Sequence, residues 1–305
     1  QAGCDNSCAY CIVPAVRGPE VSRPISDLVA EAEHLAARGI REVTLLGQNV
    51  NSYGRDITKR SPLFAQLLRE VGAVDGIDRV RFTSPHPKDL RADVVEAMAE
   101  TQAVCKQLHL PLQSGSDEVL VAMRRGYTGA RYLEKLAMAR EAIDDLAVTT
   151  DLIVGFPGET DAQFEETLRV VAEAAFDSAY VFIFSPRPGT RAADMEDAFV
   201  PEDVVAERFA QLHAVVERSA LLKHEARVGL TEDVLIDGPS RRDPSVLTGK
   251  TEQGKLVHLD AGGQVISPGD LVAVEIERAA PHFLVGRPVG EARGPRRRRL
   301  ALAGS

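Results

Sequence analysis

Residues 148–175 of this 305-residue chain read VTTDLIVGFPGETDAQFEETLRVVAEAA. Residues 148–154, with Val148 and an apolar run at 152–154, predict a buried strand, and the Gly- and Pro-containing stretch after them predicts a turn. Beyond the turn, apolar residues recur at the spacing of one helix face, at Phe164, Leu168, Val171 and Ala175. The stretch therefore predicts one strand–turn–helix unit, with the helix at 161–175.

The same unit recurs across residues 26–215. Further strands are predicted at 42–47, 79–83, 107–112 and 179–185, and further helices at 26–38, 89–100, 116–124, 130–144 and 201–225. Repeated units of this kind form a parallel sheet that is either open or curled into a barrel. The loops after the predicted strands are polar or rich in Gly and Pro, and in such barrels these loops build the active site.

From about residue 226 the pattern changes to short alternating runs separated by Gly, Pro and Asp. This pattern predicts a small antiparallel β-barrel over 226–287, after a first domain over 1–225. The Arg-rich tail at 288–305 is predicted to be disordered, with a weak nucleic-acid-binding arm as the alternative. The formal charge of −9 divides into +5 from Arg287 onward and −14 before it, which argues against polyanion binding over the whole surface.

Apolar residues make up 44% of the chain, but no apolar run approaches the ~18 residues of a membrane span. No signal-peptide pattern opens the sequence either. We therefore expect a cytoplasmic protein that does not associate with membranes. Because the sequence opens at Gln1 rather than Met, we also expect it to begin partway through a longer polypeptide.

Three of the four cysteines fall close together, in the pattern Cys4-x3-Cys8-x2-Cys11. Three thiolates do not complete a closed tetrahedral zinc site, whereas on a 4Fe–4S cluster they leave one iron open for a small molecule. The alternative is a zinc site completed by a distant ligand such as Cys105 or His109. Otherwise Cys105 is a small, partly buried apolar residue.

This cysteine pattern, with Tyr10 just before the third cysteine, resembles the signature of radical S-adenosylmethionine enzymes. The resemblance implies a partial (β/α)6 barrel that holds a 4Fe–4S cluster on Cys4, Cys8 and Cys11. In that family the open iron binds S-adenosylmethionine, and reduction cleaves this cofactor to a 5′-deoxyadenosyl radical. The family's first barrel strand lies just before the cysteine loop, so we expect this chain to lack it.

Other stretches resemble the methylthiotransferases within that family: GQNVNSY at 47–53, TSPHP at 83–87, HLPLQSGS at 109–116 and TDLIVGFPGE at 150–159. The first of them is most similar to the MiaB branch, and the β-rich segment at 226–287 resembles a TRAM domain, a small RNA-binding barrel. The resemblance implies methylthiolation of C2 of N6-isopentenyladenosine, 3′ of the anticodon in tRNA. The alternatives are a sister enzyme acting on threonylcarbamoyl-adenosine or a ribosomal protein, and a noncatalytic RNA-binding protein with structural zinc.

The resemblance also implies partners that this sequence does not itself contain. In the family an N-terminal domain supplies three further cysteines for a second 4Fe–4S cluster, the sulfur source, and only Cys105 is left here for that purpose. We therefore expect the chain alone not to methylthiolate tRNA. We further expect a monomer that takes electrons from a flavodoxin- or ferredoxin-type donor.

The resemblance assigns residues near the cofactor at the ends of successive strands. Tyr10 and Ile153 are expected near the adenine, with packing roles as the alternative. Gly47, Gln48 and Asn49 stand where the family often has Gly-Gly-Glu, which favours a backbone role over charge pairing. Hydrogen bonds to the ribose or the methionyl end are expected from Gln113, Ser114 and Asp151.

Candidate RNA contacts are the cations of the predicted C-terminal barrel, because RNA-binding barrels combine cations with stacking surfaces. They are Arg241, Arg242, Lys250 and Lys255, with His258, His282 and Phe283 beside them. Four loop arginines, Arg17, Arg23, Arg187 and Arg191, are interpreted as solvated surface residues, with tRNA phosphate contacts as the alternative. His86 and His109 are expected to be structural histidines, because radical hydrogen abstraction requires no acid or base.

Overall fold

The computed structural model describes residues 1–295, so most of the predicted basic tail lies outside the described residues. Five parallel strands form its first part: β1 Glu42–Leu45, β2 Arg79–Phe82, β3 Gln107–His109, β4 Ala147–Val154 and β5 Ser178–Ile183. Strand β1 pairs with β2, and β3, β4 and β5 pair in that order. A parallel bridge between Val80 and Val104 joins the two sheets. Every predicted strand is present, and β1 and β3 are shorter than expected.

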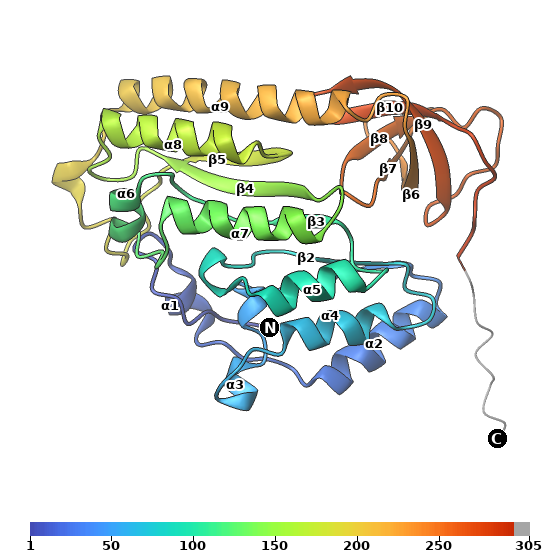
Figure 1. The fold of residues 1–305 in the computed structure, drawn as a ribbon, viewed down its shortest axis with the longest axis horizontal. Coiled ribbons are helices and arrows are strands. Elements are labelled where there is room, and N and C mark those ends of the chain that lie inside the picture. Colours follow the sequence, from blue (N-terminus) through green and yellow to red (C-terminus); the bar gives the residue numbers. More distant parts are fainter. Residues whose placement is uncertain (296–305) are drawn as a thin grey trace.

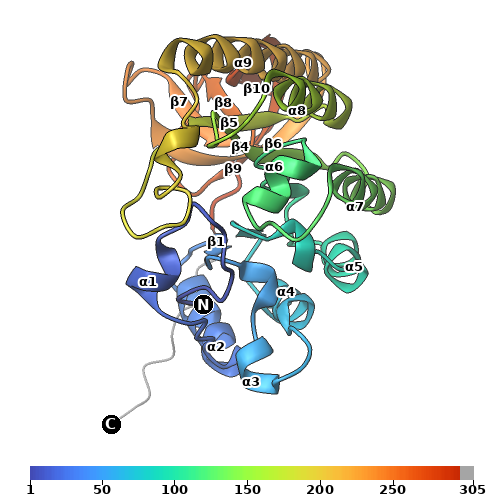
Figure 2. The same cartoon turned by 90° about the vertical axis from the view of Figure 1, so that its left-hand side faces the viewer.

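The predicted helices are also present: α2 Ile25–Ala37, α5 Ala92–Glu100, α6 Asp117–Ala122, α7 Gly129–Ala142, α8 Asp161–Ala174 and α9 Glu202–Glu225. The sequence did not predict α1 Val13–Arg17, α3 Arg55–Thr58, α4 Phe64–Gly72 or the short 3-10 helices Val50–Ser52, Pro87–Asp89 and Glu196–Ala198. The longer helices form an arc on the outer side of the strands (Figures 1 and 2). None of the helices within residues 1–295 combines the length and apolar character that a membrane span requires.

Helix α8 shows how the sequence builds one of these units. Its N-terminus is closed by a capping box, in which Thr160 and Gln163 each accept a hydrogen bond from the other's backbone N–H. Phe164 and Val171 of the predicted apolar face are buried in the core, whereas Ala175 caps the helix with a φ of 46°. The left-handed conformation of Ala175 ends the helix there, one residue earlier than predicted.

The C-terminal part is a closed barrel of five strands: β6 Thr231–Pro239, β7 Leu247–Lys250, β8 Leu256–Leu259, β9 Leu271–Ala280 and β10 Phe283–Pro288. The strand order is β10-β8-β7-β6-β9. Alternate residues fill its interior, among them Val234, Val257, Val272 and Leu284, which are completely buried. The prediction of an all-antiparallel barrel was wrong in one place, because β10 closes the barrel by pairing with β8 in parallel.

The closed barrel packs against the amino ends of the parallel strands, next to the end of α9 (Figure 1). Arg79 donates to the carbonyl oxygens of Lys250 and Asp233, both at 2.7 Å. Arg81 donates to those of Thr251 and Glu252, at 2.8 and 2.9 Å. Two arginines of β2 therefore bind the backbone of the barrel and help to fix its position.

Gly254 lies where the two parts approach most closely. Its φ is +75°, and a Cβ at this position would lie 2.4 Å from the side-chain oxygen of Gln107 at the start of β3. Glycine is required there for both reasons, since other residues disfavour this conformation and no room exists for a side chain. The junction is therefore closely packed.

Lys255, expected to contact RNA, instead forms an ion pair across this junction. Its Nζ lies 2.7 Å from Oδ1 of Asp177, and the two side chains are 5% and 9% exposed. RNA would have to break this buried pair to reach the ammonium group. The prediction for Lys255 was wrong because the sequence does not show that its turn packs against the parallel strands.

Replacing Lys255 with Met is expected to lower the free energy of unfolding by about 3–5 kcal/mol, because Asp177 is left as a buried, unpaired charge. Chemical denaturation measures the loss, and adding Asp177→Asn is expected to restore most of it. The matched control is Arg293→Met, which breaks an exposed pair with Asp233 and is expected to cost about 1 kcal/mol or less. Equal losses in Lys255→Met and the control would contradict the assignment.

Candidate functional site

The loop that carries Cys4, Cys8 and Cys11 lies over the carboxyl ends of the parallel strands (Figure 2). The N–H of Ala9 donates to the carbonyl oxygen of Met123 at 3.0 Å, and the carbonyl oxygen of Ala9 accepts from Ala192 at 2.9 Å. Lys88 Nζ donates to Oδ1 of Asn6 at 2.8 Å. Lys88, Met123 and Ala192 follow β2, β3 and β5, so the loop is anchored at the strand ends where the sequence predicted the site.

The thiols of this loop fit a cluster that binds one thiolate per iron. All are free, with Cys4 buried and Cys8 and Cys11 partly exposed. Burial raises the pKa of the Cys4 and Cys11 thiols and so favours their protonated form. Binding to iron would favour the thiolate instead, because a thiol loses its proton when it binds a metal.

Cys105 is not placed to complete a zinc site. It precedes β3, where its N–H donates to the carbonyl oxygen of Val80, and its side chain is 2% exposed. It therefore lies at the amino ends of the strands, away from the cysteine loop. Burial raises the pKa of Cys105 to about 11, as for the small apolar residue that the sequence suggested.

Arg125 is a candidate functional residue that the sequence analysis missed. Its side chain is buried, and its Nη1 lies 3.4 Å from Cys8 Sγ. Nε donates to the Tyr127 hydroxyl at 3.1 Å, and Nη2 to the carbonyl oxygen of Pro111 at 3.3 Å. Burial opposes the charge, yet Tyr127, Tyr10 and Cys8 raise the pKa of Arg125 above its ordinary value. A fixed positive charge therefore lies beside one predicted cluster ligand.

Tyr10 and Ile153 pack in one apolar cluster beneath the cysteine loop, with Ala9, Val119, Met123, Phe156, Phe184 and Ala192. Burial raises the pKa of Tyr10 above its usual range, so its hydroxyl stays protonated. The structure thus brings together the two residues expected near the adenine. Both are also packed as ordinary core residues would be.

The Gly47–Asn49 loop is built mainly from structural contacts. Gly47 is buried, and a Cβ there would lie 3.1 Å from the Cα of Val50. Gln48 is exposed, and Asn49 is 1% exposed with its Nδ2 donating to Asp89 at 2.9 Å. The expectation of a backbone role is therefore better supported than a side-chain role for Asn49.

Gln113 and Ser114 follow β3, and the structure supports a cofactor contact for the first but not for the second. Ser114 is completely buried, and its hydroxyl shares a hydrogen bond of 3.1 Å with Thr167 of α8. Its side chain is therefore engaged in packing and is no longer a candidate for a cofactor contact. Gln113 has a φ of +70°, a strained conformation for a residue other than Gly, and such strain is often found at functional sites.

Asp151 and His109 face a cavity of about 630 Å³ inside the arc of parallel strands, which we call the lumen. Asp151 Oδ2 lies 3.4 Å from His109 Nε2, and His109 Nδ1 lies 3.0 Å from the Thr149 hydroxyl. His86 is buried two residues before Lys88, which anchors the cysteine loop, and burial lowers the pKa of His86 to about 2. His86 is therefore neutral at physiological pH, as expected of a structural histidine.

The RNA candidates Arg241, Arg242 and Lys250 are exposed and share a second cavity, of about 770 Å³, on the closed barrel. We call it the barrel pocket; its lining also includes Asp237, His258, His282 and Phe283. His258 and Phe283 pack edge to face, with ring centroids 5.0 Å apart. Of the loop arginines, Arg17, Arg187 and Arg191 are exposed, and Arg23 pairs with Glu31 at 2.6 Å.

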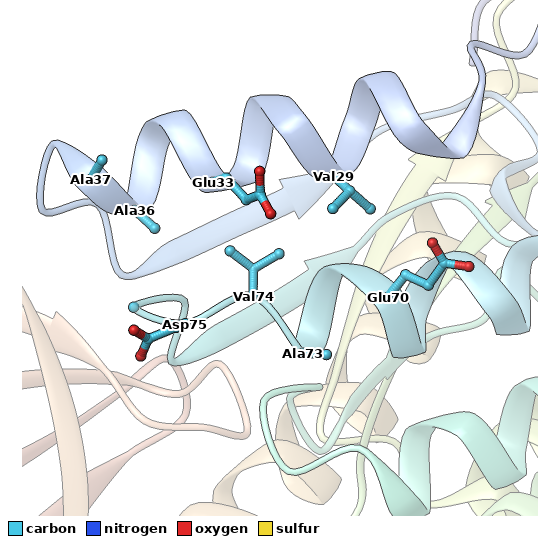
Figure 3. A pocket seen from close by; sticks show the side chains of 9 residues that line it. Val29, Glu33, Ala36, Ala37, Glu70, Ala73, Val74 and Asp75 are labelled. Atoms are coloured by element: carbon cyan, nitrogen blue, oxygen red, sulfur yellow. The ribbon is translucent and has the colours of Figure 1, made fainter. Parts of the chain in front are cut away.

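A further hollow of about 560 Å³ lies between α2 and α4 (Figure 3). Small and acidic side chains line it, among them Ala36, Ala73, Glu33 and Glu70. No candidate cofactor or RNA residue lines this hollow, so it is not part of the site.

The fold and the site together define an α/β protein with a three-cysteine loop at the carboxyl ends of its parallel strands and a closed five-stranded barrel at their amino ends. A model of the Radical SAM superfamily matches residues 1–171, and a model of the TRAM domain matches residues 225–289. The chain belongs to the Radical SAM superfamily. The predicted fold class is thereby confirmed, as are the superfamily's cofactors, a 4Fe–4S cluster and S-adenosylmethionine.

Curated relatives are similar over nearly the whole chain. A protein of Clavibacter michiganensis subsp. michiganensis is 52% identical over 313 residues, covering 100% of this chain. One of Acidothermus cellulolyticus is 51% identical over 292 residues, covering 95%. Both are named tRNA-2-methylthio-N(6)-dimethylallyladenosine synthase, and the match spans 58% of the length of each.

Among solved structures, the radical S-adenosylmethionine methyltransferase TsrM from Kitasatospora setae is similar with a TM-score of 0.51 and 18% identity. The match covers 63% of this chain and 37% of that one. At this identity the likeness supports the fold alone.

Proposed function

We propose that this chain is the radical-generating and RNA-binding part of an enzyme that methylthiolates C2 of N6-isopentenyladenosine, 3′ of the anticodon in tRNA. The observation that carries the proposal is identity of about half over nearly the whole chain to proteins named for that reaction. Since the chain spans 58% of their length, the activity is proposed for the protein to which it belongs.

In this proposal residues 1–225 form the radical domain and 226–287 the TRAM domain. Cys4, Cys8 and Cys11 hold the cluster through their thiolates, because they share one loop at the strand ends and two of them remain partly accessible. When bound, the cluster and S-adenosylmethionine supply a radical able to take hydrogen from the unactivated C2–H bond, which acid–base chemistry does not reach. The protein's own contribution is to bind, orient and exclude water.

Side chains at different positions along the strands have different roles in this proposal. Arg125 holds Cys8 and neutralises charge beneath the cysteine loop. Tyr10 and Ile153 offer the apolar wall on which an adenine can lie. Gly47 permits close approach of the backbone. Gln113 follows β3 and Asp151 lies within β4, and the two are bonded through the Gln113 N–H and the Asp151 carbonyl at 2.8 Å.

We propose further that the protein is a cytoplasmic monomer that receives electrons from a flavodoxin- or ferredoxin-type donor. The acidic body of the chain, with −14 before Arg287, supports a role in which RNA contacts are confined to local cationic sites. Size-exclusion chromatography and reduction assays with each donor test these points.

Mass spectrometry of nucleosides from tRNA tests the reaction itself. Cells that lack the gene are expected to accumulate N6-isopentenyladenosine and to recover its 2-methylthio derivative when the gene is restored. Loss of the methylthio form of threonylcarbamoyl-adenosine, or of a methylthiolated ribosomal protein, would assign the chain to a sister enzyme instead. Zinc in place of iron after anaerobic purification and reconstitution would refute the radical mechanism.

Phosphate binding in the barrel pocket predicts a specific salt dependence. Replacing Arg241 or Arg242 with Gln is expected to weaken tRNA binding and to reduce the slope of log affinity against log salt concentration by about 1 for each phosphate that is no longer neutralised. Fluorescence anisotropy over a salt series measures the slope. Arg69→Gln, an exposed arginine of α4 paired with Glu100, is the matched control, and equal slopes in all variants would rule out phosphate binding by these arginines.

A further inference from the structure

The lumen wall is organised in levels by the register of β4 and β5. Thr149 is aligned with Ser178, Asp151 with Tyr180, and Ile153 with Phe182. Thr149, Asp151, Ser178 and Tyr180 all line the lumen, and since side chains alternate along a strand, Ile153 and Phe182 face the same side. Phe182 therefore lies level with Ile153, which packs against the same apolar cluster as Tyr10, next to the cysteine loop.

Tyr180 and Phe182 form an exposed aromatic pair on this concave wall. Their side chains are 61% and 50% exposed, and their rings stack with centroids 6.5 Å apart and an interplanar angle of 21°. By contrast, Tyr53, Tyr132 and Phe156 of the same part of the chain are fully buried. Tyr180 lines the lumen and Phe182 lies two residues further along the same face of β5. Two neighbouring exposed aromatic side chains in this position indicate a binding surface rather than core packing.

The surroundings of the aromatic pair favour an RNA occupant. The lumen also contains the His109–Asp151 pair and the exposed Lys250, so polar groups converge on an aromatic surface. Lys250, Leu256 and His282 line both the lumen and the barrel pocket, which makes the two cavities neighbours that share a wall. Exposed cations that lead into a cavity with a stacking surface match the way proteins bind single-stranded RNA.

We infer that Tyr180 and Phe182 stack the target base and cover its apolar N6 substituent, so that they set the preference for isopentenylated over unmodified adenosine. This inference rests on the proposed function and assigns its substrate selectivity to two residues. Two aromatic rings offer more apolar surface than one purine base covers. An isopentenyl substituent on N6 would cover the rest of that surface, whereas an unmodified amino group would leave it exposed to water. Neighbouring phosphates would lie toward Lys250 and the barrel pocket.

The test uses the full protein carrying its clusters and an anticodon stem–loop RNA, with either N6-isopentenyladenosine or adenosine at the target position. Dissociation constants are measured by fluorescence anisotropy at one salt concentration. Tyr180→Ala and Phe182→Ala are each expected to weaken binding of the isopentenylated RNA about tenfold, the size of an ordinary stacking loss, and to bring the two dissociation constants closer together. Tyr180→Phe, which keeps the ring, is expected to preserve both.

Leu222→Ala, which removes an exposed apolar side chain from α9, is the matched control, and iron content and thermal unfolding verify that each variant is folded. Tyr180→Leu keeps apolar bulk without a ring and supplies the same test should the Ala variant fail to fold. Unchanged affinities would overturn the inference and indicate that a segment of the protein covers the rings. Equal weakening for both RNAs would overturn the selectivity role.

Failure of this inference is distinguishable from failure of the proposed function. If the unaltered protein yields no 2-methylthio-N6-isopentenyladenosine, the proposed function fails whatever the variants do. If it yields the product and the ring variants keep the full discrimination between the two RNAs, only the role of Tyr180 and Phe182 fails.

Discussion

Replacing Cys4, Cys8 or Cys11 with Ala, one at a time, is expected to abolish the 4Fe–4S cluster and the formation of 5′-deoxyadenosine. Each thiolate binds a different iron, and no other cysteine of the described residues lies in or beside the loop to substitute for a missing one. Iron and sulfide content, together with visible absorbance after anaerobic reconstitution, measure the cluster. Liquid chromatography of the reaction mixture measures cofactor cleavage.

Cys105→Ala is the matched control for these variants. Cys105 is buried at the amino ends of the strands, so its replacement is expected to leave iron content and cofactor cleavage unchanged. Iron retained at the unaltered level in any of the three loop variants would contradict the ligand assignment. Loss of iron from the Cys105 variant, with the fold intact by circular dichroism, would revive a role for that distant thiol.

The parallel strands and most helices were predictable because each is marked by local sequence. Strand β4 is marked by the apolar residues Leu152–Val154 at its carboxyl end, and a Gly- and Pro-containing loop follows it. Helix α4 was missed although Phe64, Leu67, Leu68 and Val71 have helical spacing and are buried. Its apolar pattern covers only nine residues, and no strong capping signal marks its start.

The site was predictable as far as it lies in short motifs. The cysteine pattern and Tyr10 are adjacent in sequence, and the strand-end position of Ile153 follows from the repeated unit. Arg125 lies outside any such pattern, because its contact with Cys8 joins residues 117 positions apart. What determines its role is burial beside a thiol, which only the tertiary structure reveals.

Long-range packing also explains the residues whose roles the sequence misjudged. Lys255 resembles its exposed neighbours in sequence, yet its turn docks on the parallel strands and buries the ammonium group against Asp177. Ser114 lies at a strand end as expected, but helix α8 supplies Thr167 as its partner. In both cases a polar side chain suited to ligand binding is satisfied instead by the protein itself.

Replacing Arg125 with Gln is expected to lower the reduction potential of the cluster and to suppress cofactor cleavage driven by a weak physiological donor. Reduction adds negative charge to the cluster, and the guanidinium, 3.4 Å from Cys8 Sγ in a buried setting, stabilises that added charge. Removing it therefore favours the oxidised form, and we expect a decrease of about 60 mV or more, which corresponds to tenfold in a one-electron equilibrium.

A redox titration monitored by electron paramagnetic resonance measures the potential directly, so the result does not depend on turnover. Arg125→Lys keeps the charge but not the fork that reaches Tyr127 and Pro111, and it is expected to recover part of the potential. Arg124→Gln changes the exposed neighbouring arginine and is expected to leave the potential unaltered. If Arg125→Gln retained the full cluster at an unchanged potential, the side chain would act only in packing the loop, through its bonds to Tyr127 and Pro111.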